Sequence, residues 1–184
     1  MLNTAARPLT VHDFRELPEG PPYYQLIEGD LYMSPPPNLF HQRVVLNIAF
    51  ILRLYLEDHP AGEVIVSPSG VELSDLNAYL PDLYFVSNER ASILTEQGAS
   101  GAPDLVVEIL SPRTAKYDKG VKRDVYARTG VEEMWIVDPE LKEVQVYRFA
   151  ESAGTPVATL RGKQTLTTLL LPGLRIPLAK VFRE

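Results

Sequence analysis

The sequence contains no cysteine, and this absence excludes disulfide bonds, thiolate zinc sites and cysteine nucleophiles. Only one tryptophan and three histidines occur among its 184 residues. No G-x-S-x-G motif is present, so a serine hydrolase of that type is not indicated. A chain without cysteine is typical of a reducing compartment, and we therefore expect a cytoplasmic location.

The sequence also lacks a long hydrophobic run. Its longest apolar segment, VVLNIAFILRLYL at 44–56, carries Asn47 and Arg53 and is shorter than the roughly 20 residues that span a bilayer. The first residues, MLNTAARPLTVHDF, contain no apolar stretch typical of a signal peptide. We expect no association with a membrane, and we predict a core helix over 39–58, capped by Asn38 and stopped at His59-Pro60.

An excess of basic residues is absent as well. The chain has 18 lysines and arginines against 24 acidic residues, a net charge of −6, so as a whole it would not be attracted to nucleic acid. One segment differs, because RTAKYDKGVKRDVYAR at 113–128 holds six basic and two acidic residues. If the protein binds DNA, this basic segment is the predicted contact.

The order of apolar and turn-forming segments predicts the fold class. A chain of this length is typical of one domain, and we predict helices over 39–58 and from Ser111-Pro112 to Gly130. Short runs bounded by proline and glycine predict strands within 23–33, 63–87, 103–111, 133–149 and 159–178. We expect a hairpin or meander over 63–87, a hairpin over 159–178 and a loop over 88–102.

These elements favour an α/β or α+β fold with a central mixed β-sheet flanked by helices. We divide the single domain 1–184 into an N-terminal β-ribbon extension (1–38), a core (39–150) and a C-terminal β extension (151–184). The ribbon is predicted from a Glu-Gly-Asp turn between two short strands.

Two Pro-Asp pairs each precede an apolar run, PDLYFV at 81–86 and PDLVVEIL at 103–110. Asp104 and Glu108 share one strand face but are separated by about 13 Å, too far to hold one cation easily. Asp82 can lie closer to Glu108, because neighbouring strands are about 4.8 Å apart. We predict Asp82 and Glu108 as the acid pair and Asp104 as an acceptor for backbone amides.

A buried acid pair predicts a magnesium site, with the main-chain carbonyl of Ile109 as a further candidate ligand. Such a site suits phosphodiester hydrolysis by a metal-activated water, and a nearby lysine would assist. The strand itself offers Leu110 at the next position on the same face. The segment that follows offers Lys119, Lys122 and Tyr126 on one helical flank. Spacing alone allows a second interpretation for Lys122, an i, i+4 salt bridge with Asp118.

Four ordered blocks of the sequence resemble the Uma-type restriction endonuclease family, which lies within the PD-(D/E)XK nuclease superfamily. The blocks are YYQLIEGDLYMSPPPNLFHQ (23–42), LPDLYFVS (80–87), GAPDLVVEILSP (101–112) and KGVKRDVYARTGVEEMWIVDP (119–139). The resemblance implies a restriction-endonuclease-like core with Asp82 as the first acid and Glu108 as the second. The superfamily lysine would fall at Leu110, and the family position for a displaced lysine matches Lys122.

The same resemblance adds three residues to the candidate site. Glu28 is a candidate third metal ligand, with a turn residue of the hairpin as the alternative. His41 and Gln42 match a His-Gln pair of the family, with capping or packing as the alternative for His41. The implied cofactor is Mg²⁺, with Mn²⁺ as a substitute, and the implied partners are DNA and a second copy in a homodimer or another homo-oligomer.

Three functional classes remain open from the sequence. The first is a magnesium-dependent endonuclease acting on DNA, with RNA as an untested substrate, through Asp82, Glu108 and Lys122. The second is a nuclease-fold binding or regulatory module with weak or no cleavage. The third, a two-carboxylate glycosidase, is less favoured, because such clefts carry exposed aromatics and Trp135 lies in an apolar strand typical of a core.

Overall fold

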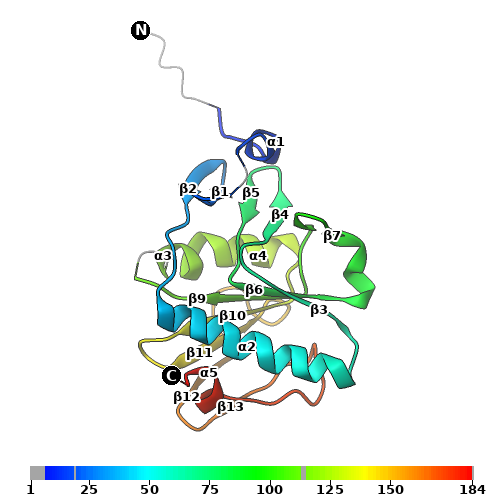
Figure 1. Cartoon of the computed structure of the whole chain (residues 1–184), viewed down its shortest axis with the longest axis vertical. Helices are drawn as coiled ribbons and strands as arrows, with labels where there is room; N and C mark the ends of the chain where they lie inside the picture. Colours follow the sequence, from blue (N-terminus) through cyan, green and yellow to red (C-terminus); the bar gives the residue numbers. More distant parts are fainter. Residues whose placement is uncertain (1–6, 19, 113–114, 184) are drawn as a thin grey trace.

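The structure is a computed structural model that describes residues 7–18, 20–112 and 115–183 (Figure 1). Its helical elements are α1 (Val11–Arg15), α2 (Leu39–Asp58), η1 (Asn88–Ile93), α3 (Ala115–Tyr117), η2 (Asp118–Lys122), α4 (Arg123–Thr129) and α5 (Leu178–Val181). Its strands are β1 (Tyr24–Ile27), β2 (Asp30–Met33), β3 (Gly62–Val66), β4 (Gly70–Ser74), β5 (Asn77–Tyr79), β6 (Leu83–Ser87), β7 (Leu94–Thr95), β8 (Gly98–Ser100), β9 (Leu105–Ile109), β10 (Glu133–Asp138), β11 (Glu143–Arg148), β12 (Ala158–Arg161), β13 (Thr165–Leu166) and β14 (Ile176–Pro177).

The described strands form two mixed six-stranded sheets and a small two-stranded one. The main sheet has the order β12-β11-β10-β9-β6-β3, in which only β9 and β10 run parallel. The second sheet has the order β2-β1-β5-β4-β8-β7, with β4 and β8 parallel. The predicted mixed α/β class is confirmed, but two sheets replace the single central sheet.

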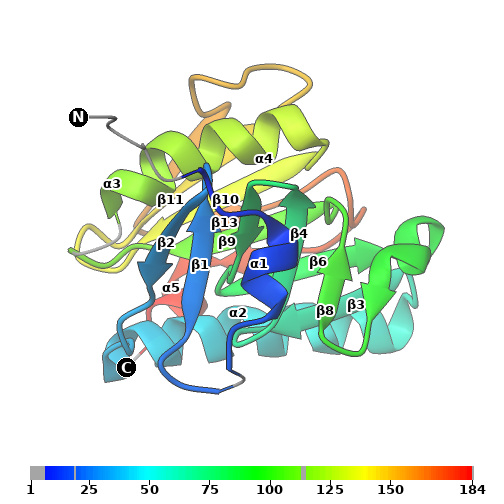
Figure 2. The same cartoon turned by 90° about the horizontal axis from the view of Figure 1, so that it is seen from above.

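The main sheet is covered on both faces. Helix α2 and the C-terminal segment pack on one face, against Leu105, Val107 and Ile109, whereas the second sheet and α4 cover the other face, around Val106 (Figures 1 and 2). Because side chains alternate along a strand, Glu108 points to the same side as Val106. The acid therefore faces α4 and the second sheet from within a fully buried strand.

Helix α2 has the predicted bounds and the predicted N-cap, since the Asn38 side chain accepts the His41 N–H at 2.8 Å. Among the described residues it is the one helix long and apolar enough to cross a membrane by length and composition. A third of that apolar window is buried within the protein. Its buried residues lie at helical spacing and pack on the main sheet: Val44, Val45, Ile48, Ala49, Leu52 and Leu56.

The predicted N-terminal hairpin is present, but it is not a separate ribbon. Strands β1 and β2 are joined by Glu28 and Gly29, both with positive φ (51° and 82°), as a two-residue hairpin of the twisted type requires. Leu26 of β1 pairs with Ala78 of β5, which adds the hairpin to the second sheet. Alternation along a strand specifies its faces but not its partner, so the sequence could not show this pairing.

The second sheet accounts for two other differences from the prediction. The expected meander over 63–87 is divided, because β3 pairs with β6 in the main sheet while β4 pairs with β5 in the second. The expected loop over 88–102 contains η1, β7 and β8. Strand β8 approaches β4 so closely that a Cβ on Gly98 would lie 2.0 Å from the Gly70 carbonyl oxygen. Small residues with little β-propensity gave no strand pattern there.

The predicted helix between Ser111-Pro112 and Gly130 is interrupted. Its described part consists of α3, a π-helical turn (η2) and α4, and Gly120 has non-helical angles (φ −115°, ψ −110°). The helix ends at Gly130, which has the predicted left-handed conformation (φ 101°). Residues 113 and 114, the first part of the basic segment, lie outside the described residues.

At the C-terminal end the predicted hairpin is present as β13 and β14, paired at Leu166 and Ile176. Strand β12 precedes this hairpin and pairs with β11 at the edge of the main sheet. Trp135 of β10 is fully buried in the core between this sheet and α2, as predicted.

Candidate active site

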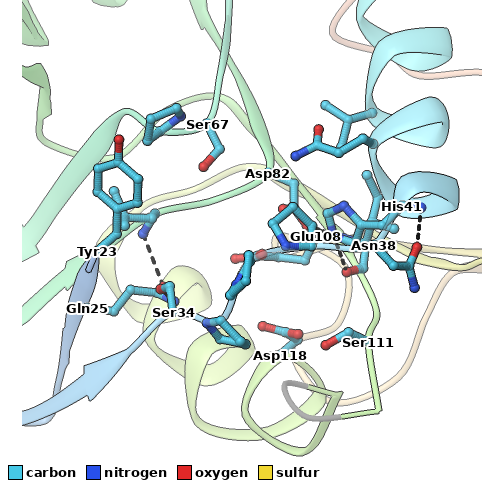
Figure 3. Close-up of a pocket in the computed structure, with 18 of the residues that line it drawn as sticks. Tyr23, Gln25, Ser34, Asn38, His41, Ser67, Asp82, Glu108, Ser111 and Asp118 are labelled. Atoms are coloured by element: carbon cyan, nitrogen blue, oxygen red, sulfur yellow. Dashed lines mark hydrogen bonds and ion pairs between the residues drawn. The ribbon is translucent and has the colours of Figure 1, made fainter. Parts of the chain in front are cut away.

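A cavity of about 920 Å³ opens beside the N-terminal end of α2 and the ends of β6 and β9 (Figure 3). Seven prolines, which flank β1, β2, β4 and α3, form much of its wall. Besides Tyr23, the titratable side chains that line it are His41, Asp82, Glu108, Asp118 and Lys122. Four of these five were singled out from the sequence as site residues, and they come from separate segments of the chain.

Asp82 and Glu108 lie next to each other across two paired strands. Strands β6 and β9 are antiparallel with Leu83 opposite Val107, which places Asp82, immediately before β6, beside Glu108. The Asp82 Oδ2 atom accepts the Ile109 N–H at 2.7 Å. The structure therefore brings together the two acids that strand geometry selected.

Asp104, the other Pro-Asp acid, has a structural role. Its carboxylate accepts the Ser87 N–H at 2.7 Å and the Ser87 hydroxyl at 3.1 Å, and Arg90 Nε lies 3.3 Å away. These bonds tie the end of β6 to the start of β9. The prediction of Asp104 as an acceptor for backbone amides is confirmed.

Lys122 reaches Glu108 from the π-helical turn. Its Nζ lies 2.6 Å from Glu108 Oε1 and 3.0 Å from Asp118 Oδ1, and all three side chains are buried. Lys122 thus makes the i, i+4 salt bridge with Asp118 and also lies beside Glu108, but the bridge is buried and not on a solvated helix face. Asp118 was considered only as a salt-bridge partner, and its place in the cavity wall could not be read from the sequence.

Burial and mutual charge perturb this cluster. Burial raises the pKa of Glu108 to about 8; Lys122 opposes this shift, while Asp118 and Asp82 add to it. Burial would lower the pKa of Lys122, but the carboxylates of Asp118 and Glu108 outweigh it and raise that pKa instead. Lys122 is thus a cation at neutral pH, beside an acid whose proton is exchangeable in the same range.

Two tyrosines complete the buried surroundings of Glu108. The Tyr126 hydroxyl donates to Glu108 Oε1 at 2.7 Å, and its ring packs edge-on against Tyr79 with centroids 5.3 Å apart. Lys122 Nζ lies 5.5 Å from the centroid of the Tyr79 ring, within the range of a cation–π contact. Burial raises the pKa of Tyr126, so its hydroxyl keeps its proton and remains a donor.

His41 connects α2 to the acid pair. Its Nε2 lies 3.3 Å from Asp82 Oδ2 and 3.1 Å from the Ile109 carbonyl oxygen, while Nδ1 has no hydrogen-bond partner among the described residues. Burial lowers the pKa of His41, but the hydrogen bond and charge of Asp82, the Ile109 carbonyl and the charge of Glu108 together outweigh it, and the net shift is upward. Gln42 follows on the exposed side and also lines the cavity.

Glu28 and Lys119 are placed away from this cluster. The Glu28 carboxylate pairs with Arg128 and accepts a hydrogen bond from Asn77 Nδ2 at 3.1 Å, and Glu28 does not line the cavity. Lys119 is exposed on the far side of Gly120, whose non-helical angles separate it from Lys122 and Tyr126. The predicted single flank of three residues is divided by that break.

The donor set in the cavity suits a hard divalent cation. The Asp82 and Glu108 carboxylates converge, and the raised pKa of Glu108 marks a site where added positive charge would be stabilising. Among the described residues, no three His, Asp or Glu side chains are grouped as a ready metal cage.

The described hydrogen bonds to Glu108 both reach Oε1, from Lys122 and Tyr126. The Ile109 carbonyl accepts from His41. Two protein carboxylates with water or substrate oxygens are a common arrangement for Mg²⁺.

The fold and the cavity define a mixed α/β protein with a buried Asp-Glu-Lys cluster at the end of two antiparallel strands. The profile of the Uma2 family, described as "Putative restriction endonuclease", matches residues 11–179, and the chain belongs to this family.

The chain is similar to a protein of Anabaena variabilis and to one of Synechocystis. The crystal structure of a "putative nuclease belonging to DUF820" from Anabaena variabilis ATCC 29413 superposes with a TM-score of 0.80 at 19% identity. The match covers 95% of this chain and 98% of that one, and it shows a shared fold. An uncharacterised protein of Synechocystis, sll1609, is 25% identical over 126 residues, which are 67% of this chain and 71% of that protein.

Proposed function

We propose that the protein is a Mg²⁺-dependent endonuclease with a restriction-endonuclease-like core that hydrolyses phosphodiester bonds of DNA. One observation carries the proposal: Lys122 Nζ lies 2.6 Å from Glu108, next to Asp82, although Leu110 occupies the superfamily position of the lysine. Leu110 packs in the core instead. The acid pair and its lysine are thus assembled in space from β6, β9 and η2.

Each residue of the cluster would have a separate role in the reaction. Asp82 and Glu108 hold the cation, which when bound supplies positive charge to the phosphate and lowers the pKa of a coordinated water. Lys122 provides a fixed ammonium group for the negative charge that develops on the phosphate oxygens. Asp118 and Tyr126 keep Lys122 and Glu108 in place, and His41 orients the Asp82 carboxylate.

The proposed DNA contact is smaller than the basic segment suggested. Lys122 is buried in the cluster, Arg123 pairs with Asp124, and Arg128 pairs with Glu28. Among the described residues of the segment, this leaves the exposed Lys116 and Lys119 for phosphate contacts. We propose that these two lysines guide the backbone toward the cavity.

The test is cleavage of supercoiled and linear DNA by the purified chain with Mg²⁺ or Mn²⁺. We expect nicking and linearisation, abolished in Glu108→Gln and Asp82→Asn and reduced at least about a hundredfold in Lys122→Met. The matched control is Glu133→Gln, which changes another buried strand glutamate outside the cavity and should keep activity. Wild-type rates in Glu108→Gln, with folding confirmed by circular dichroism, would refute the site.

A second candidate function has an observation of its own. Lys122 Nζ lies within hydrogen-bonding distance of both Glu108 and Asp118, and these contacts satisfy the buried groups without any metal ion. Such a network suits a nuclease-fold module that binds nucleic acid or a partner without cutting. Calorimetry separates the two functions: Mg²⁺ or Mn²⁺ binding that is lost in Asp82→Asn supports the nuclease, and no binding by the wild type supports the module.

A further inference from the structure

The outer face of α2 carries a row of exposed apolar side chains. Leu46, Phe50 and Leu54 are 67%, 64% and 53% exposed, on a helix whose opposite face packs on the main sheet (Figure 1). Large exposed apolar side chains gathered on one face are typical of an interaction site. Two exposed charged residues end the row: Arg43 lies about one turn before Leu46, and Glu57 lies about one turn after Leu54.

Between Arg43 and Glu57 the row is symmetric about Phe50, whereas Leu39, also exposed (68%), lies beyond Arg43 at the start of the helix. Its members follow at intervals of three, four, four and three residues: Arg43, Leu46, Phe50, Leu54 and Glu57. At about 100° per residue they lie within an arc of about 80° on the helix. Read in either direction from Phe50, the row meets a leucine and then a charged residue, but the two charges are opposite in sign. A helix with this pattern is complementary to an antiparallel copy of itself.

We propose that the α2 faces of two copies of this chain pack antiparallel to form a homodimer, with Phe50 on the two-fold axis. Phe50 then meets Phe50 of the partner subunit, and Leu46 lies opposite the partner's Leu54. Arg43 lies opposite the partner's Glu57, and this ion pair occurs twice by symmetry. An isologous interface requires this kind of self-complementary patch.

The charges favour a second copy over a membrane as the occupant of this face. Arg43 and Glu57 form no ion pair with the described residues of their own chain, so both remain available to a partner. The C-terminal end of the row carries two carboxylates, Glu57 and Asp58, against one exposed arginine, Arg53, and this excess of negative charge would be repelled by an anionic lipid surface. In an antiparallel helix pair the same acidic end meets Arg43 of the other copy.

The dimer would leave both cavities open. His41, which marks the cavity on α2, is nine residues from Phe50, so the two cavities would be separated by about 27 Å along the helix axes. The interface and the acid cluster therefore share no residue. Dimerisation can be tested whether or not the chain cuts DNA.

The test measures the mass of the full chain by sedimentation velocity over a range of concentrations. We expect a dimer for the wild type and a monomer for Phe50→Glu, since that variant places two carboxylates against each other on the axis. Leu141→Glu, an equally exposed leucine (61%) in the turn between β10 and β11, is the matched control and should remain dimeric. A wild type that is monomeric throughout, or a dimeric Phe50→Glu, would overturn the proposal.

A charge exchange tests the antiparallel register. Arg43→Glu and Glu57→Arg each place like charges opposite one another twice, and each should weaken the dimer by on the order of tenfold. The double variant restores opposite charges and should recover the wild-type dissociation constant. Failure of the double variant to recover, with its fold intact, would contradict this register. Binding of the monomeric protein to anionic vesicles, lost in Phe50→Glu, would show a lipid occupant and refute the dimer.

Discussion

The buried acid Glu108 should make the stability of the protein depend on pH in a way that one substitution removes. Its side chain is almost completely buried, at 3% exposure, and its pKa is raised from 4.5 to about 8, chiefly by burial. Between these two pH values the folded state binds a proton that the unfolded state releases. The stabilisation is complete below pH 4.5 and is lost as the pH rises through about 8.

The change in the free energy of unfolding follows from the difference between the pKa of Glu108 in the unfolded state and in the folded state. At about 1.4 kcal/mol for each pH unit, the free energy of unfolding should fall by roughly 5 kcal/mol between pH 4.5 and pH 8 on account of Glu108 alone. Glu108→Gln keeps the shape of the side chain and its contacts with Tyr126 and Lys122 but cannot ionise. The variant should therefore lose this contribution to the pH dependence.

The assay is urea denaturation of the wild type and Glu108→Gln at pH 5, 7 and 9 without divalent ions. We expect the variant to gain stability relative to the wild type as the pH rises, by several kcal/mol over the range. The control is Glu63→Gln, an exposed glutamate of β3, which should follow the wild type. Parallel curves for the wild type and Glu108→Gln would refute the reasoning that burial dominates at Glu108.

Three further changes test the surroundings of the site. Tyr126→Phe removes the hydroxyl that donates to Glu108 and should lower the free energy of unfolding by about 1 to 3 kcal/mol; an unchanged urea midpoint would contradict that bond. Asn38→Ala removes the N-cap of α2 and should cost about 1 kcal/mol in the same assay, with Ser92→Ala, at an exposed position, as the control. Gly62→Ala would place a Cβ 2.1 Å from the Val86 carbonyl oxygen, so thermal melting should occur several degrees lower; a higher melting temperature would show that the strand can shift freely.

Much of the fold followed from local patterns. The 20-residue α2 and its cap were predicted because apolar spacing, Asn38 and the His59-Pro60 stop all agree. The pairing of β1 and β2 was predicted from the Glu-Gly turn. The second sheet was missed because its strands are short and it depends on the close approach of Gly98 to Gly70, which no periodicity records.

The acid pair was predictable because strand geometry is regular. The rise per residue ruled out Asp104 as a partner for Glu108, and the spacing between strands allowed Asp82. The lysine was harder to place, because spacing along a regular helix allowed both Asp118 and Glu108 as partners of Lys122. The break at Gly120 made both contacts simultaneous and moved Lys119 away.

By itself the sequence determined helix α2 and the longer strands, which acids share a strand face, and that no thiol chemistry is present. These are properties of neighbours along the chain, and rotation and rise per residue fix them. Only the tertiary structure decided that Lys122, Asp118 and Tyr126 close around Glu108, that Glu28 pairs with Arg128, and that one face of α2 stays exposed. Those outcomes depend on which segments meet in space, and burial then sets the pKa of each group that they enclose.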